Sequence, residues 1–221
     1  MKSFGWLREL AGFILEANCP LCQRSTPHEL CQDCQRRILR CQLPEEDRLQ
    51  AGQPPVFAWG SYRGALKQAI AVLKYHNQPQ VARPLAQQLA SSWLAGNPPA
   101  PLTVVPIPIH VRKRQQRGYN QADLLAKHFC EFTRQPLALE GLERSQETVA
   151  QFTLSPAKRE QNLARAFSLG KAFCNQPPST PVLLLDDIYT TGATARSAAQ
   201  TLRRHGIRVD GIAVVARTSR D

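Results

Sequence analysis

Residues 182–194 read VLLLDDIYTTGAT, an apolar run followed by two carboxylates and a loop of threonine and glycine. The run from Val182 to Leu185 predicts a strand buried on both faces of a parallel sheet. A helix is predicted from Ala195 to His205, with Gly206 at its end. The loop therefore lies at the carboxyl end of a strand, where ligands bind in open α/β sheets.

The residue types of this loop favour a sugar phosphate. Backbone N–H groups at the start of a helix carry partial positive charge and suit a phosphate. Asp186 and Asp187 would repel a phosphate, but carboxylates are strong acceptors for sugar hydroxyls. From the residues alone, the two aspartates could also be merely exposed or bind a cation. The predicted phosphate contacts are Thr190, Thr191, Gly192, Ala193 and Thr194.

Strands and helices alternate along the rest of the chain, which implies an α/β fold with a parallel sheet covered on both faces. The polar segment Ser145–Asn162 lacks a period and is predicted as a long loop that closes over the site. Apolar spacing predicts strands over Val56–Tyr62, Leu102–Ile109, Leu137–Leu142 and Ile207–Ala216, and helices over Gly64–Tyr75, Val81–Gly96 and Gln121–Thr133.

Two Cys-x-x-Cys pairs near the N-terminus predict a structural zinc site. The spacing lets both thiolates of each pair reach one ion, and four soft ligands close a tetrahedral site. A redox pair or buried free thiols are the alternatives. A segment of about 30 residues buries too little surface to fold alone, which favours a bound metal. The predicted ligands are Cys19, Cys22, Cys31 and Cys34, whereas Cys41, Cys130 and Cys174 are read as ordinary buried or free cysteines.

The chain has 221 residues and a formal net charge of +11, with 28 Lys+Arg against 17 Asp+Glu. Bases and acids balance within residues 1–50, so the excess lies wholly after them. Such an excess suits nucleic acid or a small polyphosphate. Arg112, Lys113, Arg114 and Arg117 follow a predicted strand; they are either a solvated basic turn or a pyrophosphate grip, since guanidinium groups bind phosphate oxygens in pairs.

Composition excludes several classes of protein. Apolar residues make up 43% of the chain, enough for a packed core. No apolar stretch approaches the roughly 20 residues that span a bilayer, so membrane insertion is not expected. Arg8, Glu9 and Glu16 interrupt the apolar N-terminus too early for a signal peptide. We expect a cytoplasmic protein without disulfides.

The apolar strand, paired aspartates and TTG-x-T loop together resemble the ribose-phosphate signature of type I phosphoribosyltransferases, which bind phosphoribosyl pyrophosphate (PRPP). Tyr189 stands where an aliphatic residue is usual. Residues 105–109 (VPIPI), Arg112, Arg114 and residues 117–122 (RGYNQA) are similar to a hallmark of the ComF (competence protein F) family. Further matches are Arg144, Thr148, Gln151, Leu154, Arg159, Asn162, Ala166 and Phe167.

The resemblance covers roughly Cys19 to Arg217 and implies a type I phosphoribosyltransferase-like fold behind a small N-terminal zinc module. The expected division is an N-terminal helix and four-cysteine module in residues 1–50, a linker over Leu43–Pro55, and a phosphoribosyltransferase-like domain in residues 51–221. The resemblance implies PRPP with Mg²⁺ as ligand, a catalytic role for Asp186 and Asp187, and PRPP contacts from residues 190–194, Arg112, Arg114 and Arg117. Arg144, Lys158 and Arg159 either close onto the pyrophosphate or form a solvated face.

Two functions from different classes stay open. The first is a phosphoribosyltransferase that displaces pyrophosphate at the ribose anomeric carbon; its acceptor is not readable from the sequence. The second is a non-catalytic factor or scaffold that binds single-stranded DNA and works with the competence machinery during natural transformation. Aromatic residues are only 7% of the chain, so DNA affinity is expected to be mainly electrostatic.

Overall fold

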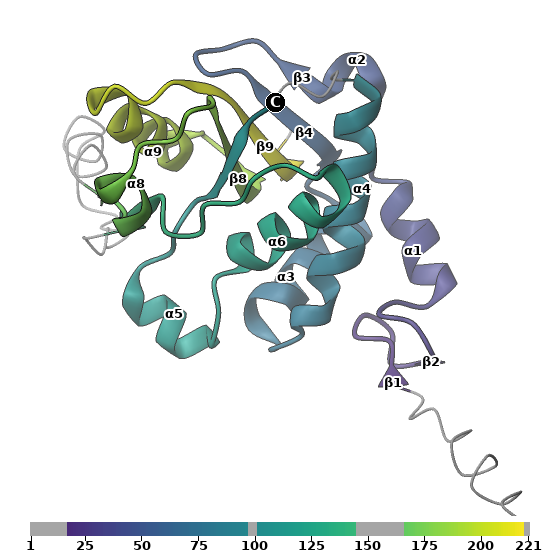
Figure 1. Ribbon diagram of the computed structural model, residues 1–221. Coiled ribbons are helices and arrows are strands. Elements are labelled where there is room, and N and C mark those ends of the chain that lie inside the picture. The colour runs from purple at the N-terminus through teal and green to yellow at the C-terminus, as the bar shows by residue number, and fades with distance from the viewer. Residues whose placement is uncertain (1–16, 97–100, 145–165, 219–221) are drawn as a thin grey trace, which may run out of the picture.

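The computed structural model describes residues 17–96, 101–144 and 166–218, arranged around one central sheet (Figure 1). The sheet has five strands in the order β3-β4-β9-β8-β5. Neighbours from β4 to β5 run parallel, and β3 pairs antiparallel with β4 at the edge. The predicted α/β class with a parallel sheet is confirmed. The strands are β3 (Leu49–Gln50), β4 (Val56–Ser61), β5 (Thr103–Pro106), β8 (Val182–Tyr189) and β9 (Val209–Arg217).

The β8 strand lies inside the sheet between β9 and β5. Its apolar half is fully buried because Leu184 pairs with Ile212 on one side and with Val105 on the other. The predicted end at Leu185 is too early. Pairing with β9 continues to Tyr189, opposite Arg217, so both aspartates belong to the strand itself.

Helices cover the two faces of the sheet, with α3, α4 and α6 on one side and α9 on the other (Figure 1). Successive strand residues point to opposite faces. Leu183 and Leu185 therefore join the core with the first three helices, while Leu184 packs with α9. These helices agree with the predicted ones to within two residues and are α3 (Gly64–Tyr75), α4 (Ala82–Gly96, preceded by the short turn η2, Pro79–Val81), α6 (Gln121–Thr133) and α9 (Ala193–Arg204).

The predicted strand Leu137–Leu142 is wrong. Leu137 makes only an isolated bridge to Val104, because the chain turns back where Gly141 N–H donates to the Ala138 carbonyl (3.3 Å). Beyond this turn lie the antiparallel pair β6 (Leu142–Arg144) and β7 (Phe167–Leu169), then α8 (Lys171–Asn175). The strand predicted over Leu102–Ile109 ends at Pro106, before α5 (Val111–Arg117).

The cysteine pairs lie on a hairpin of β1 (Ala17–Asn18) and β2 (Ser25–Thr26) and on α1 (Gln32–Leu39). This module shares the core of the sheet, because Leu30 and Ile38 are buried in the same cluster as Leu66 of α3. Gln68 Nε2 also donates to the Leu21 carbonyl (3.0 Å). The module is therefore built onto α3.

The segment Leu43–Pro55, predicted as a linker, contains α2 (Glu45–Arg48) and β3. Before them, Leu43 N–H donates to the Trp59 carbonyl (3.0 Å) and Ser61 N–H donates to the Cys41 carbonyl (2.8 Å). The chain therefore follows β4 as it leaves the module. The acidic, proline-containing composition of this segment predicts a linker. Its pairing with β4 uses backbone groups, which composition does not reveal.

Two predicted features, the N-terminal helix ahead of Ala17 and the loop Ser145–Asn162, lie outside the described residues. That loop contains Thr148, Gln151, Leu154, Lys158, Arg159 and Asn162. No helix in the described ranges has both the length and the apolar character needed to cross a membrane.

Candidate functional site

The carboxyl edge of the sheet gathers most of the predicted ligand-binding residues. Neighbouring parallel strands end at the same edge, so the segments that follow β5 and β8 lie on one side of the molecule. A hollow at this edge is lined by Asp186, residues 188–195 and Val214. One predicted carboxylate and the whole predicted phosphate loop therefore share a surface, comprising Asp186, Thr190, Thr191, Gly192, Ala193 and Thr194.

The paired aspartates point in different directions. Both lie within β8, where successive side chains alternate between the two faces. Asp186 is half-buried and lines the hollow. Asp187 is only 2% exposed and faces α3 and α6. The sequence suggested one shared role, whereas the structure gives the two carboxylates different surroundings.

Asp187 is held by two side chains that sequence reasoning did not select. The Lys74 ammonium, in the last turn of α3, forms an ion pair with Asp187 Oδ2. Gln121 Nε2, in the first residue of α6, donates to Asp187 Oδ1 (3.0 Å). Gln121 lies in the RGYNQA motif, which was the only available signal; Lys74 lies in an ordinary amphipathic helix and gave none.

Asp186 is costly to ionise in this position. Burial, followed by the adjacent Asp187 carboxylate, raises the pKa of Asp186 well above its ordinary value; the Asp187 N–H (2.8 Å to Asp186 Oδ1) and the Lys74 charge oppose the rise. Burial lowers the pKa of Arg144, and attraction to Asp186 opposes that shift. The Arg144 guanidinium stands over the Phe167 ring, 5.4 Å from its centroid. A ligand that brings hydroxyl donors to Asp186 would stabilise its charged form.

The loop after β8 forms the N-terminus of α9. Gly192 is the N-cap and has φ = 74°, in the left-handed region that favours glycine. A Cβ there would lie 2.1 Å from the Tyr189 hydroxyl oxygen, so the aromatic side chain requires a glycine opposite it. Gly192 has no side chain to cap the helix, and Thr191 Oγ1 accepts only a long hydrogen bond from Ala193 N–H (3.5 Å), so the N–H groups of the first turn are available at the loop. This end of α9 is suited to an anion.

The basic segment α5 follows β5 at the same edge. Arg112, Lys113 and Arg114 are exposed, and Arg114 forms an ion pair with Asp123 of α6 (3.6 Å). Burial raises the pKa of Asp123, and the Arg114 charge opposes the shift. The ion pair with Asp123 directs Arg114 to α6, whereas the aspartates of β8 are contacted by Lys74 and Gln121.

Arg117 is connected to the aspartates through the RGYNQA motif. Gly118 has φ = 83° and ends α5, as the turn requires. Arg117 Nη1 donates to Gln121 Oε1, and Gln121 in turn binds Asp187. Asn120 caps α6 by accepting from Ala122 N–H (3.2 Å) and donates to the Ile107 carbonyl (3.2 Å). The motif thus links the basic segment to α6 and to the buried carboxylate.

The four predicted metal ligands lie together. Cys19 and Cys22 occupy the turn of the β1–β2 hairpin, Cys31 is the N-cap of α1, and Cys34 is in its first turn. Their sulfurs lie within 4.8 Å of one another, with 3.5 Å between those of Cys22 and Cys31. Zinc–sulfur bonds of about 2.3 Å in a tetrahedron place sulfurs at similar separations. The four cysteines could therefore hold a metal ion such as zinc.

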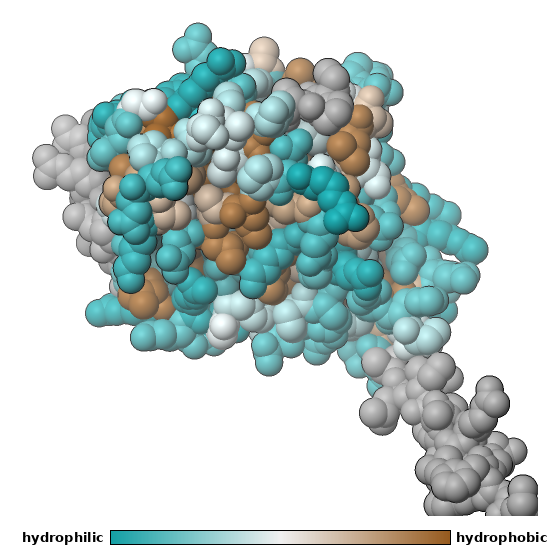
Figure 2. Space-filling view, in the orientation of Figure 1, coloured by the Kyte–Doolittle hydropathy of each residue, from teal (hydrophilic) through white to brown (hydrophobic). Residues whose placement is uncertain are grey.

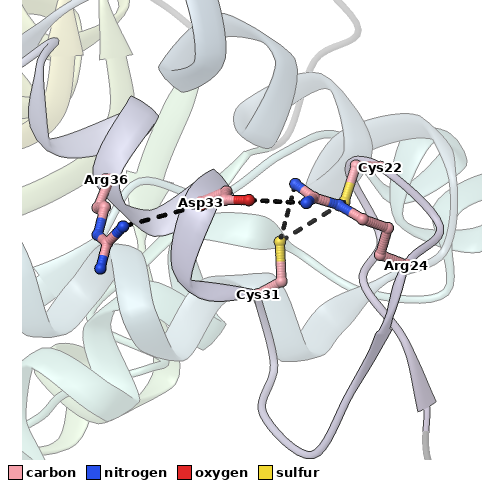
Figure 3. A network of polar contacts seen from close by, with 5 residues as sticks. All are labelled: Cys22, Arg24, Cys31, Asp33 and Arg36. Carbon is pink, nitrogen blue, oxygen red and sulfur yellow. Dashed lines mark hydrogen bonds and ion pairs between the residues drawn. The ribbon is translucent and has the colours of Figure 1, made fainter.

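Arg24 lies beside these sulfurs and was not selected from the sequence (Figure 3). Its Nε donates to Cys22 Sγ (3.4 Å) and its Nη1 donates to Asp33 Oδ2 (2.7 Å). The Arg24 side chain lowers the pKa of Cys22 to about 6. Burial raises the pKa of Cys19, but backbone N–H groups, led by that of Cys31, outweigh it and the net pKa is lowered. Such donors favour the thiolate form that binds metal.

Three known proteins show what the chain is similar to. It is 33% identical to competence protein F of Haemophilus influenzae over 152 residues, which are 67% of this chain and 66% of that protein. It is 26% identical to competence protein ComFC of Bacillus subtilis over 201 residues, 90% of this chain and 75% of that protein. It is 27% identical to DNA utilization protein YhgH of Escherichia coli over 208 residues, 90% of each.

No protein-family model matches the chain. Among solved structures, adenine phosphoribosyltransferase from Leishmania donovani is similar with a TM-score of 0.43 and 15% identity, covering 76% of this chain and 74% of that one.

Proposed function

Because the chain belongs to the ComF family, together with competence protein F and ComFC, we propose that it binds PRPP or a related ribose phosphate and takes part in the use of incoming DNA. The observation that carries the proposal is the hollow shared by Asp186 and the loop 190–194 at the N-terminus of α9. A phosphate and a sugar hydroxyl need those two kinds of partner side by side.

In this proposal, the ligand phosphate takes its hydrogen bonds from the loop and from the first turn of α9. The ribose hydroxyls donate to Asp186, whose raised pKa marks a carboxylate that gains from such donors. Asp187 acts as a positioning residue, because Lys74 and Gln121 already occupy both of its oxygens. The pyrophosphate extends toward Arg117 and the exposed Arg112 and Arg114.

Mg²⁺ would bind with PRPP and neutralise part of the pyrophosphate charge. It needs few protein ligands, and Asp186 is the half-buried carboxylate of the hollow that could supply one. If the protein turns PRPP over, a nitrogen of the acceptor forms a bond to the anomeric carbon as the bond to pyrophosphate breaks. The chain's own contribution is to orient the ribose and to stabilise charge on the leaving group with Arg117 and its neighbours.

Zinc is proposed for the four cysteines in a structural role. Four protein ligands leave no open position for a substrate. The ion would join the β1–β2 hairpin to the start of α1, and α1 packs against α3, which carries Lys74. The metal would thereby support the edge of the sheet from a distance.

Calorimetric titration of PRPP in the presence of Mg²⁺ tests the proposal. We expect binding by the unaltered chain, loss of binding in Asp186→Asn, and normal binding in Asp210→Asn, whose carboxylate lies near the amino end of β9. Absence of binding by the unaltered chain would overturn the proposal, and so would equal losses in both variants. Pyrophosphate release with a panel of nitrogenous acceptors then shows whether turnover occurs.

Binding of single-stranded DNA is the second candidate function, with the competence machinery as partner and the cytoplasm as its place. The exposed basic side chains of α5 favour this function. Affinity should fall steeply as salt rises, since phosphate contacts release counterions. A chain without measurable affinity for single strands at low salt would contradict this function.

A further inference from the structure

Tyr75 is the most exposed large apolar side chain in the described part of the protein, at 74%. It is the last residue of α3 and lies between Lys74 and His76. A single exposed ring is ordinary on a protein surface, so what distinguishes Tyr75 is its place beside the basic residues of α5.

The ring has a charged neighbour, and the backbone around it is fixed by other contacts. The Arg117 guanidinium stands over one face, 5.5 Å from the ring centroid. The Tyr119 hydroxyl donates to the Leu73 carbonyl, which fixes the turn after α5 against the end of α3. The neighbouring Lys74 is anchored by its ion pair with Asp187. The ring has one face toward Arg117 and offers its exposed surface to a planar ligand.

The surroundings of the ring are basic. Residues 107–119 contain four Lys or Arg residues and no Asp or Glu. The nearest acids on the elements that meet here are already paired, Asp123 with Arg114 and Asp187 with Lys74. Over α5, Figure 2 shows hydrophilic side chains around a small apolar area, and Val111 there is 56% exposed. An anionic ligand with a flat apolar part matches this surface.

We propose that Tyr75 and Arg117 form a stacking platform for an unpaired nucleobase, and that the phosphates of the same strand lie along α5. Aromatic rings and guanidinium planes both stack on bases regardless of sequence. The seven residues of α5 span about 10 Å, which is room for more than one phosphate of a single strand. The low aromatic content of the chain suggested no such platform; a single well-placed ring supplies one.

The platform deepens the proposed function, because it rests on the same edge of the sheet. The Arg117 guanidinium that covers Tyr75 also binds Gln121, which holds Asp187. A base on Tyr75 therefore lies at the basic end of a polar chain that leads to the proposed ribose-phosphate site. A base within a strand and a free base would both stack on this ring, so the experiment distinguishes the two.

Fluorescence anisotropy with a labelled thymidine oligonucleotide and an abasic strand of equal length tests the platform. Tyr75→Ala should weaken binding of the thymidine strand about 5-fold or more and leave the abasic strand unaffected. Tyr75→Phe should retain the affinity because it keeps the ring. Phe132→Ala, which removes an exposed aromatic of α6, is the matched control and should change neither strand.

Equal losses on the two strands in Tyr75→Ala, or no loss on either, would overturn the proposal. If free thymine or thymidine monophosphate competes and the two strands bind equally, the proposed platform for a strand is refuted and the site binds a free base instead. PRPP titration of Tyr75→Ala should be normal. Failure of PRPP binding in the unaltered chain would refute the proposed function while the two-strand comparison still decides the platform.

Discussion

The cysteine module and the carboxyl edge of the sheet both concentrate chemistry in few residues, but they are assembled differently. All four sulfurs of the module come from residues 19–34, so local spacing brings them together. At the carboxyl edge, Asp187 meets Lys74 and Gln121, which lie on separate helices. A local cluster can be recognised from spacing, whereas a network between distant elements depends on the fold.

The two regions also differ in charge. Bases and acids of residues 1–50 balance, and Arg24 there is shared between Asp33 and the sulfurs. Around α5 the bases are in excess and exposed. The module is therefore expected to contribute stability, and the edge is expected to contribute binding, at a cost in stability.

The largest effect is expected from loss of one cysteine ligand. Cys34→Ser should abolish stoichiometric metal binding and lower the free energy of unfolding by about 5 kcal/mol or more, because metal binding to such sites is coupled to folding. Cys34 is buried in the core shared with α3, so the loss should spread beyond the module. Metal analysis and denaturant unfolding measure both effects.

Cys174→Ser is the control for the cysteine ligand, since Cys174 is exposed and lies far along the chain in α8. It should keep both the metal and the stability. A chelator added to the unaltered chain should reproduce the Cys34→Ser loss. If Cys34→Ser retains full metal content and stability, the module is not held by metal.

The adjacent aspartates should respond in opposite ways to the same substitution. Asp187→Asn leaves the Lys74 ammonium, 18% exposed, without its carboxylate and should cost about 3 kcal/mol of stability. Asp186→Asn keeps the oxygen that accepts from the Asp187 N–H and removes a carboxylate that is costly to ionise, so it should raise the melting temperature while PRPP binding is lost. Destabilisation by both variants would refute the division of roles.

The pH dependence follows from the raised pKa of Asp186. Because the folded state binds this proton more tightly than the unfolded state, ionisation reduces stability. The reduction is absent below the ordinary aspartate pKa of 3.8 and becomes complete as pH rises through the raised pKa. Asp186→Asn should flatten this part of the stability–pH curve, measured by thermal unfolding across that range.

Features set by local sequence could be predicted, whereas contacts between distant segments could not. The buried run of β8, the amphipathic helices and the four cysteines are local patterns, and each was predicted from period or spacing. The continuation of β8 through Asp186 and Asp187 was missed, because polar residues mark a strand end unless a neighbour such as β9 extends the pairing. Lys74 was missed because its partner Asp187 lies in a distant segment of the chain. Arg24 was missed because the spacing of the cysteines does not mark a nearby arginine as a donor to their sulfurs.

Two glycines with left-handed backbones test the phosphate loop. Gly192→Ala and Gly206→Ala should each lose about 1 kcal/mol or more, since φ is 74° and 75°. A Cβ at Gly206 meets nothing within 4 Å, whereas at Gly192 it meets the Tyr189 side chain. Gly192→Ala should therefore be the more destabilising and should also weaken PRPP binding. Equal unfolding energies would show that Tyr189 moves aside freely.

The smallest effect is expected from the ion pair that joins the module to α4. Arg83 and Glu29 are 3.0 Å apart, but their side chains are 59% and 32% exposed. Arg83→Ala should cost only about 0.5 kcal/mol, and less at high salt, because exposed pairs are screened by water and ions. Arg208→Ala, which breaks the exposed pair with Asp210, is a control of the same kind. Denaturant unfolding at low and high salt gives both values.

A much larger, salt-dependent loss of stability in Arg83→Ala alone would mean that the module is held to α4 by charge. A small loss would mean that the module is held by the shared apolar core around Leu30 and Ile38.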